Sequence, residues 1–200
     1  LDLNFKDEIR LFPEPALGDE IYGVVNLSVA NIRSTPAHTS ELATQALLGT
    51  PVKIYKKTPG FYLIQTPDNY IAWVDDDGIT QMNKAQLNEW LNSEKVIYTK
   101  EYGFSYSQSN EFSSRVSDLT AGNILILLGL ENNFYKVKYP DGRIAFVDIN
   151  NCEKFITLLN KRNPTETDIV STAQLFMGIP YLWGGTSAKG MDCSGFTKTV

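Results

Sequence analysis

Alternating hydrophobic and polar positions form two similar blocks along the chain, and each block predicts a β-hairpin. Residues 61–75 and 134–148 align without a gap at an offset of 73, and eight of the fifteen aligned pairs are identical. In each block, two short runs of β-branched and aromatic residues flank a turn, Pro67-Asp68-Asn69 or Pro140-Asp141-Gly142. Another short apolar run lies upstream of each block. This spacing of strands and turns predicts two small β-barrels.

Two further stretches have a helical pattern. Apolar residues at Leu87, Trp90 and Leu91 follow i, i+3, i+4 spacing, which predicts an amphipathic helix that packs against a barrel. A second helix is predicted to begin near Pro164 and to end at residues 177–180, a stretch that contains glycine and proline.

These patterns divide the chain into six parts. They are an N-terminal arm (1–20), a first barrel (21–80), a helical connector (81–94), a second barrel (95–153), a charged linker (154–163) and a third segment (164–200). The expected fold class is therefore mainly β, with helices concentrated in the third segment.

Composition and charge narrow the range of functions. The 200 residues are 42% hydrophobic and carry a net charge of −5, without an extended cluster of Lys and Arg. This disfavours binding to nucleic acid. No apolar run approaches the ~18 residues that a membrane span needs. Two cysteines and one histidine match no metal-ligand spacing, so we expect neither a metal nor a cofactor.

The two cysteines have different surroundings in the sequence. Cys152 follows an apparent strand, where a small buried apolar side chain is expected. Cys193 follows Asp192 at the expected start of a helix, where Asp is a natural N-cap and the helix dipole favours a thiolate. The single histidine, His38, lies in a turn-rich stretch, so we expect an exposed loop residue. A position near the mouth of a site is the alternative.

Residues 181–185, Tyr-Leu-Trp-Gly-Gly, and residues 192–196, Asp-Cys-Ser-Gly-Phe, together resemble the nucleophile region of the NlpC/P60 cysteine peptidases. These papain-like enzymes cut bacterial cell-wall peptides. The resemblance covers about residues 164–200 and implies that this part begins an α+β papain-like domain with Cys193 as nucleophile. The family's catalytic His and its orienting residue lie downstream of the Cys motif. We therefore expect the domain to be cut at Val200 and the full protein to continue; an inactive chain is the alternative.

The two predicted barrels resemble bacterial SH3 (SH3b) domains. Residues 29–36 contain Asn31-Ile32-Arg33-Ser34, which is similar to a strand and turn of that family, and residues 70–74 match its closing Tyr-x-x-Trp-Val element. The second copy departs from the pattern at residues 105–107 and at Phe146. A ligand surface of the first barrel is therefore expected to be lost in the second.

Within the NlpC/P60 family, this combination resembles endopeptidases that cut between γ-D-Glu and a diamino acid in murein stem peptides with a free N-terminal L-Ala. The resemblance implies that Asp192 binds the substrate's amino group besides capping the helix, and that Ser194 contacts substrate. The Tyr181 hydroxyl is expected to line the pocket or to assist the oxyanion, with buried aromatic packing as the alternative. Glu41 and Tyr70 of the first barrel are expected to meet the ammonium group. Trp183 is expected to serve packing.

Two other functions remain open from the sequence. One is a cell-wall-binding protein, without catalysis, built on two SH3b barrels and a vestigial catalytic domain. The other keeps the fold but acts as an acyl transferase or as an amidase on other amides. The chain begins with Leu1 rather than Met, which favours an exported protein of the cell envelope, although a cytoplasmic role stays open. We expect a monomer.

Overall fold

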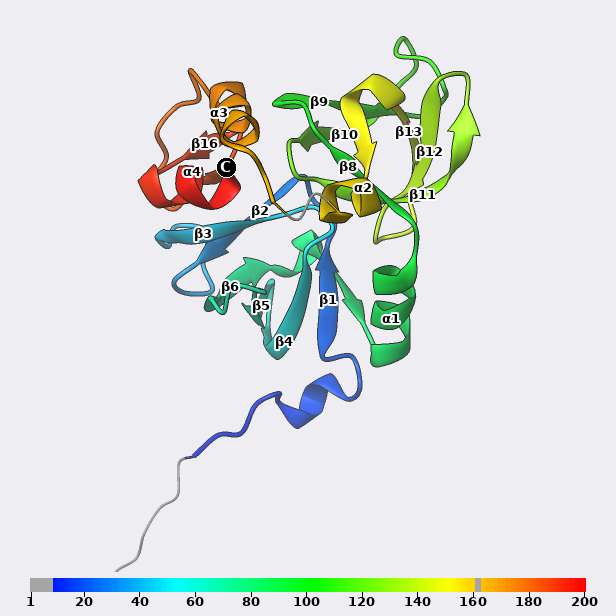
Figure 1. The fold of residues 1–200 in the computed structure, drawn as a ribbon. Coiled ribbons are helices and arrows are strands. Elements are labelled where there is room, and N and C mark those ends of the chain that lie inside the picture. The colour runs from blue at the N-terminus through cyan, green and yellow to red at the C-terminus, as the bar shows by residue number, and fades with distance from the viewer. Residues whose placement is uncertain (1–8, 161–162) are drawn as a thin grey trace, which may run out of the picture.

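The computed structural model describes residues 9–160 and 163–200 of the chain (Figure 1). Two seven-stranded antiparallel sheets are followed by a third segment made mainly of helices. The strands of the first sheet are β1 (Tyr22–Val25), β2 (Val29–Arg33), β3 (Leu42–Leu47), β4 (Pro51–Thr58), β5 (Phe61–Gln65), β6 (Ile71–Asp75) and β7 (Ile79–Met82). Those of the second sheet are β8 (Lys95–Tyr98), β9 (Tyr102–Tyr106), β10 (Arg115–Thr120), β11 (Ile124–Glu131), β12 (Phe134–Lys138), β13 (Ile144–Asp148) and β14 (Cys152–Lys154).

The two sheets share one topology. The strand order is β3-β2-β6-β5-β4-β1-β7 in the first and β10-β9-β13-β12-β11-β8-β14 in the second. Each strand of the first sheet begins 73 residues before its counterpart, as Tyr22 and Lys95 show for β1 and β8. The predicted hairpins are confirmed, with Phe61 opposite Asp75 and Phe134 opposite Asp148. The repeat therefore extends over both sheets in full, well beyond the fifteen aligned residues.

Neither sheet is closed by hydrogen bonds between its edge strands in the described residues, so the two small barrels predicted from the sequence are not confirmed. The edge of β3 is instead covered by the third segment. There Thr186 donates its amide N–H to the side chain of Gln45 at 2.9 Å and its hydroxyl to the Gln45 carbonyl at 3.2 Å. The polar groups of an open edge need partners, and the third segment supplies them here.

The turn after the third strand of each sheet reaches into the next part of the molecule. Leu48 follows β3 but is fully buried in the core of the second sheet, beside Val96 and Leu125. The equivalent residue of the second sheet, Ala121, packs against Phe176 and Met191 of the third segment. Each module therefore contributes an apolar side chain to the module that follows it.

The two cores differ at one pair of equivalent positions. In the second sheet, the buried Ser105 hydroxyl lies 2.7 Å from the Tyr139 hydroxyl, and burial raises the pKa of Tyr139. The corresponding residues of the first sheet are Ile32 and Thr66, which are also buried. A large and a small side chain have exchanged places between the two copies, and a hydrogen bond satisfies the polar groups in the second.

Helix α1 (Lys84–Asn92) joins the two sheets, as predicted for residues 81–94. Asn83 caps it by accepting hydrogen bonds from the amides of Ala85 and Gln86. Leu87 and Trp90 are buried in a cluster with Val24 and Met82. Of the three residues on the predicted apolar face, Leu91 is the one left largely exposed.

The N-terminal arm is described from residue 9, and its residues 1–8 lie outside the described part. A 3-10 helix, η1 (Pro15–Leu17), places Leu17 in the core of the first sheet. The Glu14 amide donates to the Tyr55 carbonyl at 2.8 Å, and the Glu14 carboxylate pairs with Lys56 at 3.2 Å. The described part of the arm therefore packs on β4.

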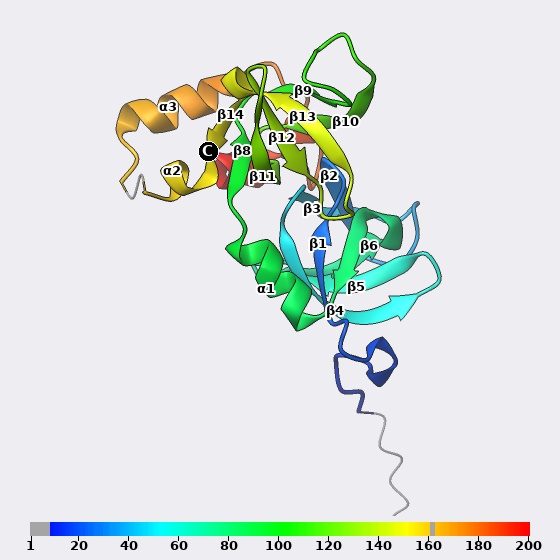
Figure 2. The same ribbon diagram turned by 90° about the vertical axis from the view of Figure 1, so that its right-hand side faces the viewer.

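The segment 154–163, predicted as a linker, contains helix α2 (Phe155–Asn160), and residues 161–162 of that linker lie outside the described part. Helix α3 (Glu166–Leu175) begins at Thr165, whose side chain and that of Asp168 form a capping box. The third segment continues with the short strands β15 (Thr186–Ser187) and β16 (Gly190–Met191) and with helix α4 (Cys193–Thr199). Figures 1 and 2 show this segment beside both sheets, with α4 over β3 and α3 near β8 and β14. No helix in the described ranges is long and apolar enough to cross a membrane.

We expect Leu48→Ala to lower the free energy of unfolding by about 2–5 kcal/mol, because it opens a cavity in the core of the second sheet. Urea unfolding followed by circular dichroism measures this loss. Leu128→Ala is the matched control, since Leu128 is 49% exposed on β11 and its truncation should change stability by no more than about 0.5 kcal/mol. A loss at Leu48 as small as that of the control would show that the two sheets do not share a core.

Candidate functional site

Cys193 is the first residue of helix α4, and Asp192 is its N-cap. One carboxylate oxygen of Asp192 accepts the amide N–H of Gly195 at 2.7 Å and the hydroxyl of Ser194 at 2.8 Å. The other oxygen accepts the amide N–H of Gly184 at 3.0 Å. Asp192 thus joins the two sequence motifs, Tyr-x-Trp-Gly-Gly and Asp-Cys-Ser-Gly-Phe, at the cysteine.

These hydrogen bonds lower the pKa of Asp192 below its usual value. The amide of Gly195 contributes most, followed by the Ser194 hydroxyl and the Gly184 amide. Hydrogen bonds to the ionised form of a carboxyl group favour that form. The carboxylate is therefore charged at neutral pH, and three local donors hold it in place beside Cys193.

Two glycines of the motifs are required by close backbone approaches. Gly184 has a φ of +74°, and a Cβ at this position would lie 2.5 Å from the carbonyl oxygen of Leu42 in β3. A Cβ on Gly195 would overlap the carbonyl oxygen of Gly185. Side chains at either place would push α4 away from its support. These glycines allow the cysteine helix to approach the first sheet closely.

The two thiols differ in accessibility. Cys193 is exposed, whereas Cys152 is buried in the core of the second sheet, and both are free. Burial raises the pKa of Cys152 to about 12, with a smaller contribution from the charge of Asp148. The predicted buried position of Cys152 is confirmed. Of the two, only Cys193 presents a thiol to a ligand in solution.

A contact between the first sheet and the Trp-Gly-Gly motif frames the site. The Trp183 indole N–H donates to the Glu41 carboxylate at 3.1 Å, and Glu41 lies just before β3. Trp183 and Tyr181 are 64% and 67% exposed. The packing role expected for Trp183 is therefore wrong, because its ring faces solvent and its N–H holds a carboxylate of the first sheet.

Tyr70 lies in the turn between β5 and β6 and is half exposed. This turn reaches the other end of α4, where Asp68 pairs with Lys198 at 2.6 Å. The structure therefore brings Glu41 to the Trp183 motif and the Tyr70 turn to the C-terminal half of the cysteine helix. Tyr181 and Ser194 lie on the two motifs themselves.

His38 is exposed, as expected for a loop histidine. Its Nδ1 lies 3.6 Å from the Asp75 carboxylate, and its ring lies 5.1 Å from that of Phe61. Both partners belong to the first sheet, at the β5–β6 hairpin. Both contacts hold His38 against the first sheet, and neither involves Cys193.

Four residues that contact the site region were not identified from the sequence: Ser28, Gln45, Asp118 and Lys189. Gln45 on β3 and Asp118 on β10 occupy equivalent positions of the repeat, 73 residues apart. Both bind the β15–β16 hairpin that precedes Cys193. A signal existed, because both are polar residues inside β-strands at one repeat position, but it required aligning the full repeat.

Known proteins resemble this chain in sequence. The family model for the bacterial dipeptidyl-peptidase SH3 domain matches residues 32–79, which lie within the first sheet. A γ-D-glutamyl-L-lysine dipeptidyl-peptidase of Bacillus cereus is 29% identical over 171 residues, which are 82% of this chain and 50% of that protein. The protein of the same name from Bacillus subtilis is 34% identical over 137 residues, which are 67% of this chain and 41% of that protein. The chain thus spans about half the length of these curated relatives.

A solved structure shows the same arrangement. The crystal structure of an NlpC/P60 family protein from Bacillus cereus superposes with a TM-score of 0.75 at 25% identity. The match covers 89% of this chain and 70% of that one. An SH3-like domain and a mainly β fold are therefore established for this chain.

We expect Asp192→Ala to lower the free energy of unfolding at pH 7 by about 0.5–2 kcal/mol, because α4 loses its N-cap. The folded-state pKa of Asp192 is lowered, so its contribution is present above the unfolded pKa of about 4 and is lost as the pH falls through the folded value. The difference between wild type and variant should therefore shrink on acidification.

Urea unfolding between pH 7 and pH 3 measures this dependence. Asp192→Asn is the control, since Asn caps helices nearly as well as Asp and should keep most of the stability at pH 7. A difference between wild type and Asp192→Ala that is independent of pH would contradict the charged-cap assignment.

Proposed function

Because this chain belongs to the NlpC/P60 family of cysteine peptidases, we propose that the complete protein hydrolyses peptides of the bacterial cell wall with Cys193 as nucleophile. The observation that supports this most directly is the exposed Cys193 thiol at the start of α4, directly after Asp192, whose carboxylate accepts the Gly184 amide of the Trp-Gly-Gly motif. The thiolate attacks the peptide carbonyl, the C–N bond breaks and the amine leaves with a proton. Water then hydrolyses the thioester to the free acid.

This reaction needs a base for the thiol proton, and we propose the family's histidine for that role. His38 is the single histidine of the 200 residues, and its contacts lie within the first sheet. Since the chain spans about half of its curated relatives, we propose that the base belongs to a part of the protein that follows Val200. The third segment would then be the first part of an α+β papain-like domain, and the second sheet a second SH3b module of the same topology.

The proposed substrate is a murein stem peptide with a free N-terminal L-Ala, cut between γ-D-Glu and the diamino acid. Two relatives bear names that describe this type of bond. The geometry is compatible, because the carboxylates of Glu41 and Asp192 both contact the Trp-Gly-Gly motif, at Trp183 and at Gly184. Two negative charges at this motif suit an ammonium group. We assign that group to Glu41 and Asp192, and further substrate contacts to Tyr181, Ser194 and Tyr70.

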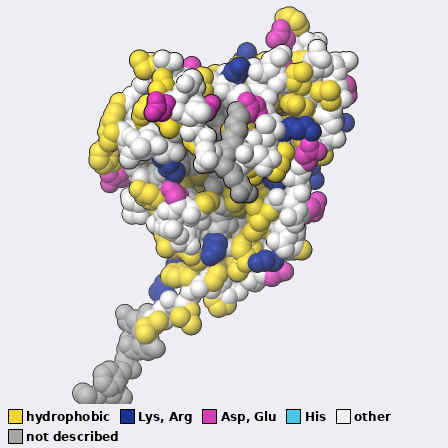
Figure 3. Space-filling model, in the orientation of Figure 1, with side chains coloured by type: hydrophobic (Ala, Val, Ile, Leu, Met, Phe, Trp, Pro, Cys, Tyr) yellow, Lys and Arg dark blue, Asp and Glu magenta, His cyan; other side chains and the backbone are white. Residues whose placement is uncertain are grey.

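The surface charges also fit a peptide rather than a polyanion. On the face that Figure 3 shows, acidic and basic side chains are interspersed and no basic patch is present. From the substrate we propose that the protein acts as a monomer in the cell envelope. Fractionation and light scattering of the native protein test both points.

We expect Cys193→Ser to abolish hydrolysis of L-Ala-γ-D-Glu-diaminopimelate by the complete protein, because a serine hydroxyl in this setting is a far weaker nucleophile than a thiolate. Release of L-Ala-γ-D-Glu measured by chromatography checks this. Cys152→Ser is the matched control and should keep kcat, since its side chain is buried in the second sheet. Hydrolysis by the Cys193 variant at the wild-type rate would remove this residue as nucleophile.

Wild-type protein that binds murein sacculi but hydrolyses no stem peptide would instead support the non-catalytic cell-wall-binding function. A murein pull-down run alongside the hydrolysis assay therefore separates the two functions.

We expect Glu41→Gln to raise KM about tenfold or more for a peptide with a free N-terminus, because the variant loses the charge that faces the ammonium group. Steady-state kinetics with the free and the N-acetylated tripeptide measure the effect. The loss should vanish with the acetylated peptide, which has no ammonium group. An equal loss with both peptides would assign Glu41 to holding Trp183 rather than to binding the substrate.

A further inference from the structure

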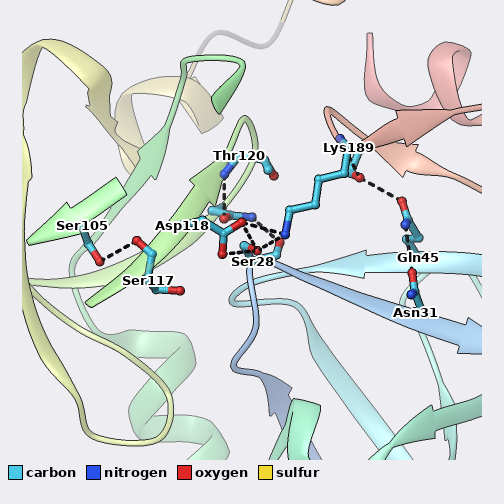
Figure 4. Close-up of polar contacts among 10 residues, drawn as sticks. Ser28, Asn31, Gln45, Ser105, Ser117, Asp118, Thr120 and Lys189 are labelled. Carbon is cyan, nitrogen blue, oxygen red and sulfur yellow. Dashed lines mark hydrogen bonds and ion pairs between the residues drawn. The ribbon is translucent and has the colours of Figure 1, made fainter. Parts of the chain in front are cut away.

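A polar network fixes the hairpin that carries the cysteine helix. The β15–β16 hairpin ends at Met191, one residue before the N-cap Asp192, so its position sets where α4 begins. The side chain of Lys189, at the tip of the hairpin, extends toward the second sheet in Figure 4. Its Nζ lies 2.7 Å from the Asp118 carboxylate and 2.8 Å from the Ser28 hydroxyl.

The partners of Lys189 are themselves held in place. Ser28 is buried and donates its hydroxyl to Asp118 at 2.9 Å. The buried side chain of Asn123 donates to the Ser28 carbonyl at 2.8 Å and accepts the Thr120 amide at 3.0 Å. A carboxylate so fixed is a rigid anchor, because its neighbours leave it little freedom to follow a moving lysine.

The other strand of the hairpin is bound to the first sheet. Gln45 is buried and accepts from the Thr186 amide and from the Ser187 hydroxyl, both at 2.9 Å. Its own amide group donates to Asn31 at 3.0 Å, which fixes its orientation. Gln45 and Asp118 occupy the same position of the repeat. The two sheets therefore bind the hairpin with equivalent side chains: Gln45 binds Thr186 and Ser187, and Asp118 binds Lys189.

We propose that Lys189 and Asp118 are positioning residues, through which the second sheet sets the place of Cys193 relative to Glu41 and Trp183. This proposal rests on the proposed peptidase function. In this proposal the second sheet contributes to turnover by positioning Cys193, without binding a ligand itself. Gln45 fixes one strand of the hairpin to the first sheet. Lys189 supplies a second point of attachment at the tip, on Asp118 of the second sheet and on Ser28, and this second point prevents rotation about the first.

The test compares two lysine variants of the complete protein. Lys189→Met removes the ammonium group but keeps an apolar side chain of similar length. Lys154→Met is the matched control, because Lys154 on β14 also forms a 2.7 Å ion pair, with Glu94 just before β8, and is similarly exposed. We expect Lys189→Met to lower kcat at least about tenfold with KM changed by less than about twofold, since small displacements of a reacting group are costly. The control should keep both constants.

Two further variants separate positioning from general damage. Lys189→Arg should recover most of kcat, because it restores a cation for Asp118. Asp118→Asn should reproduce the loss, and combining it with Lys189→Met should add little, as expected for two residues that act as a unit. An equal loss of kcat in Lys154→Met would overturn the proposal, and so would wild-type kcat in Lys189→Met.

Hydrogen exchange distinguishes failure of this inference from failure of the proposed function. The amides of residues 186–191 should exchange about tenfold faster in Lys189→Met than in wild type and at the wild-type rate in Lys154→Met. If the wild-type protein hydrolyses no peptide, the peptidase function fails and exchange alone decides the anchoring role. Faster exchange with unchanged kcat in an active enzyme would show a structural contact without a role in catalysis.

Discussion

The place of Cys193 depends on how the third segment is attached to the two sheets. This segment buries few large apolar side chains of its own, and Phe176 and Met191 share their cluster with Ala121 of the second sheet. Apolar contacts are non-directional, so they orient a segment less sharply than hydrogen bonds do. The hairpin donates such directional bonds to Gln45 on β3 and to Asp118 on β10. We therefore attribute the position of Cys193, the proposed nucleophile, to contacts with both sheets, which Asp192 refines locally.

The same dependence explains the two glycine-containing motifs. Gly184 must accept a positive φ and lie against the Leu42 carbonyl, while its amide donates to Asp192. The motif that looks like a catalytic signature in the sequence is in large part a docking element that brings α4 close to β3. The proposed chemistry and the assembly of the segment therefore use the same few residues, and we expect a substitution at Gly184 to disturb both.

Sequence patterns were sufficient to predict the local elements, but they were insufficient to predict how those elements pack against one another. The hairpins at residues 61–75 and 134–148, the helix around Trp90 and the capping role of Asp192 follow from short-range rules of turns, amphipathic spacing and caps. The open sheet edges did not follow, because a strand at an edge has the same alternating pattern as one inside a barrel. The exposure of Trp183 was also missed, since its partner Glu41 lies 142 positions away in the chain.

The exchanged pair in the two cores has a consequence for the history of the repeat. Ile32 and Thr66 of the first copy correspond to Ser105 and Tyr139 of the second, so each core balances one larger against one smaller side chain. Recombination between the duplicated halves of the gene that transferred only one of the two strands would bring Ile next to Tyr, or Ser next to Thr. A core with Ile beside Tyr would be overfilled, and a core with Ser beside Thr would contain a void. Both changes are destabilising. We therefore expect such a compensated pair to disfavour the exchange of sequence between the two copies.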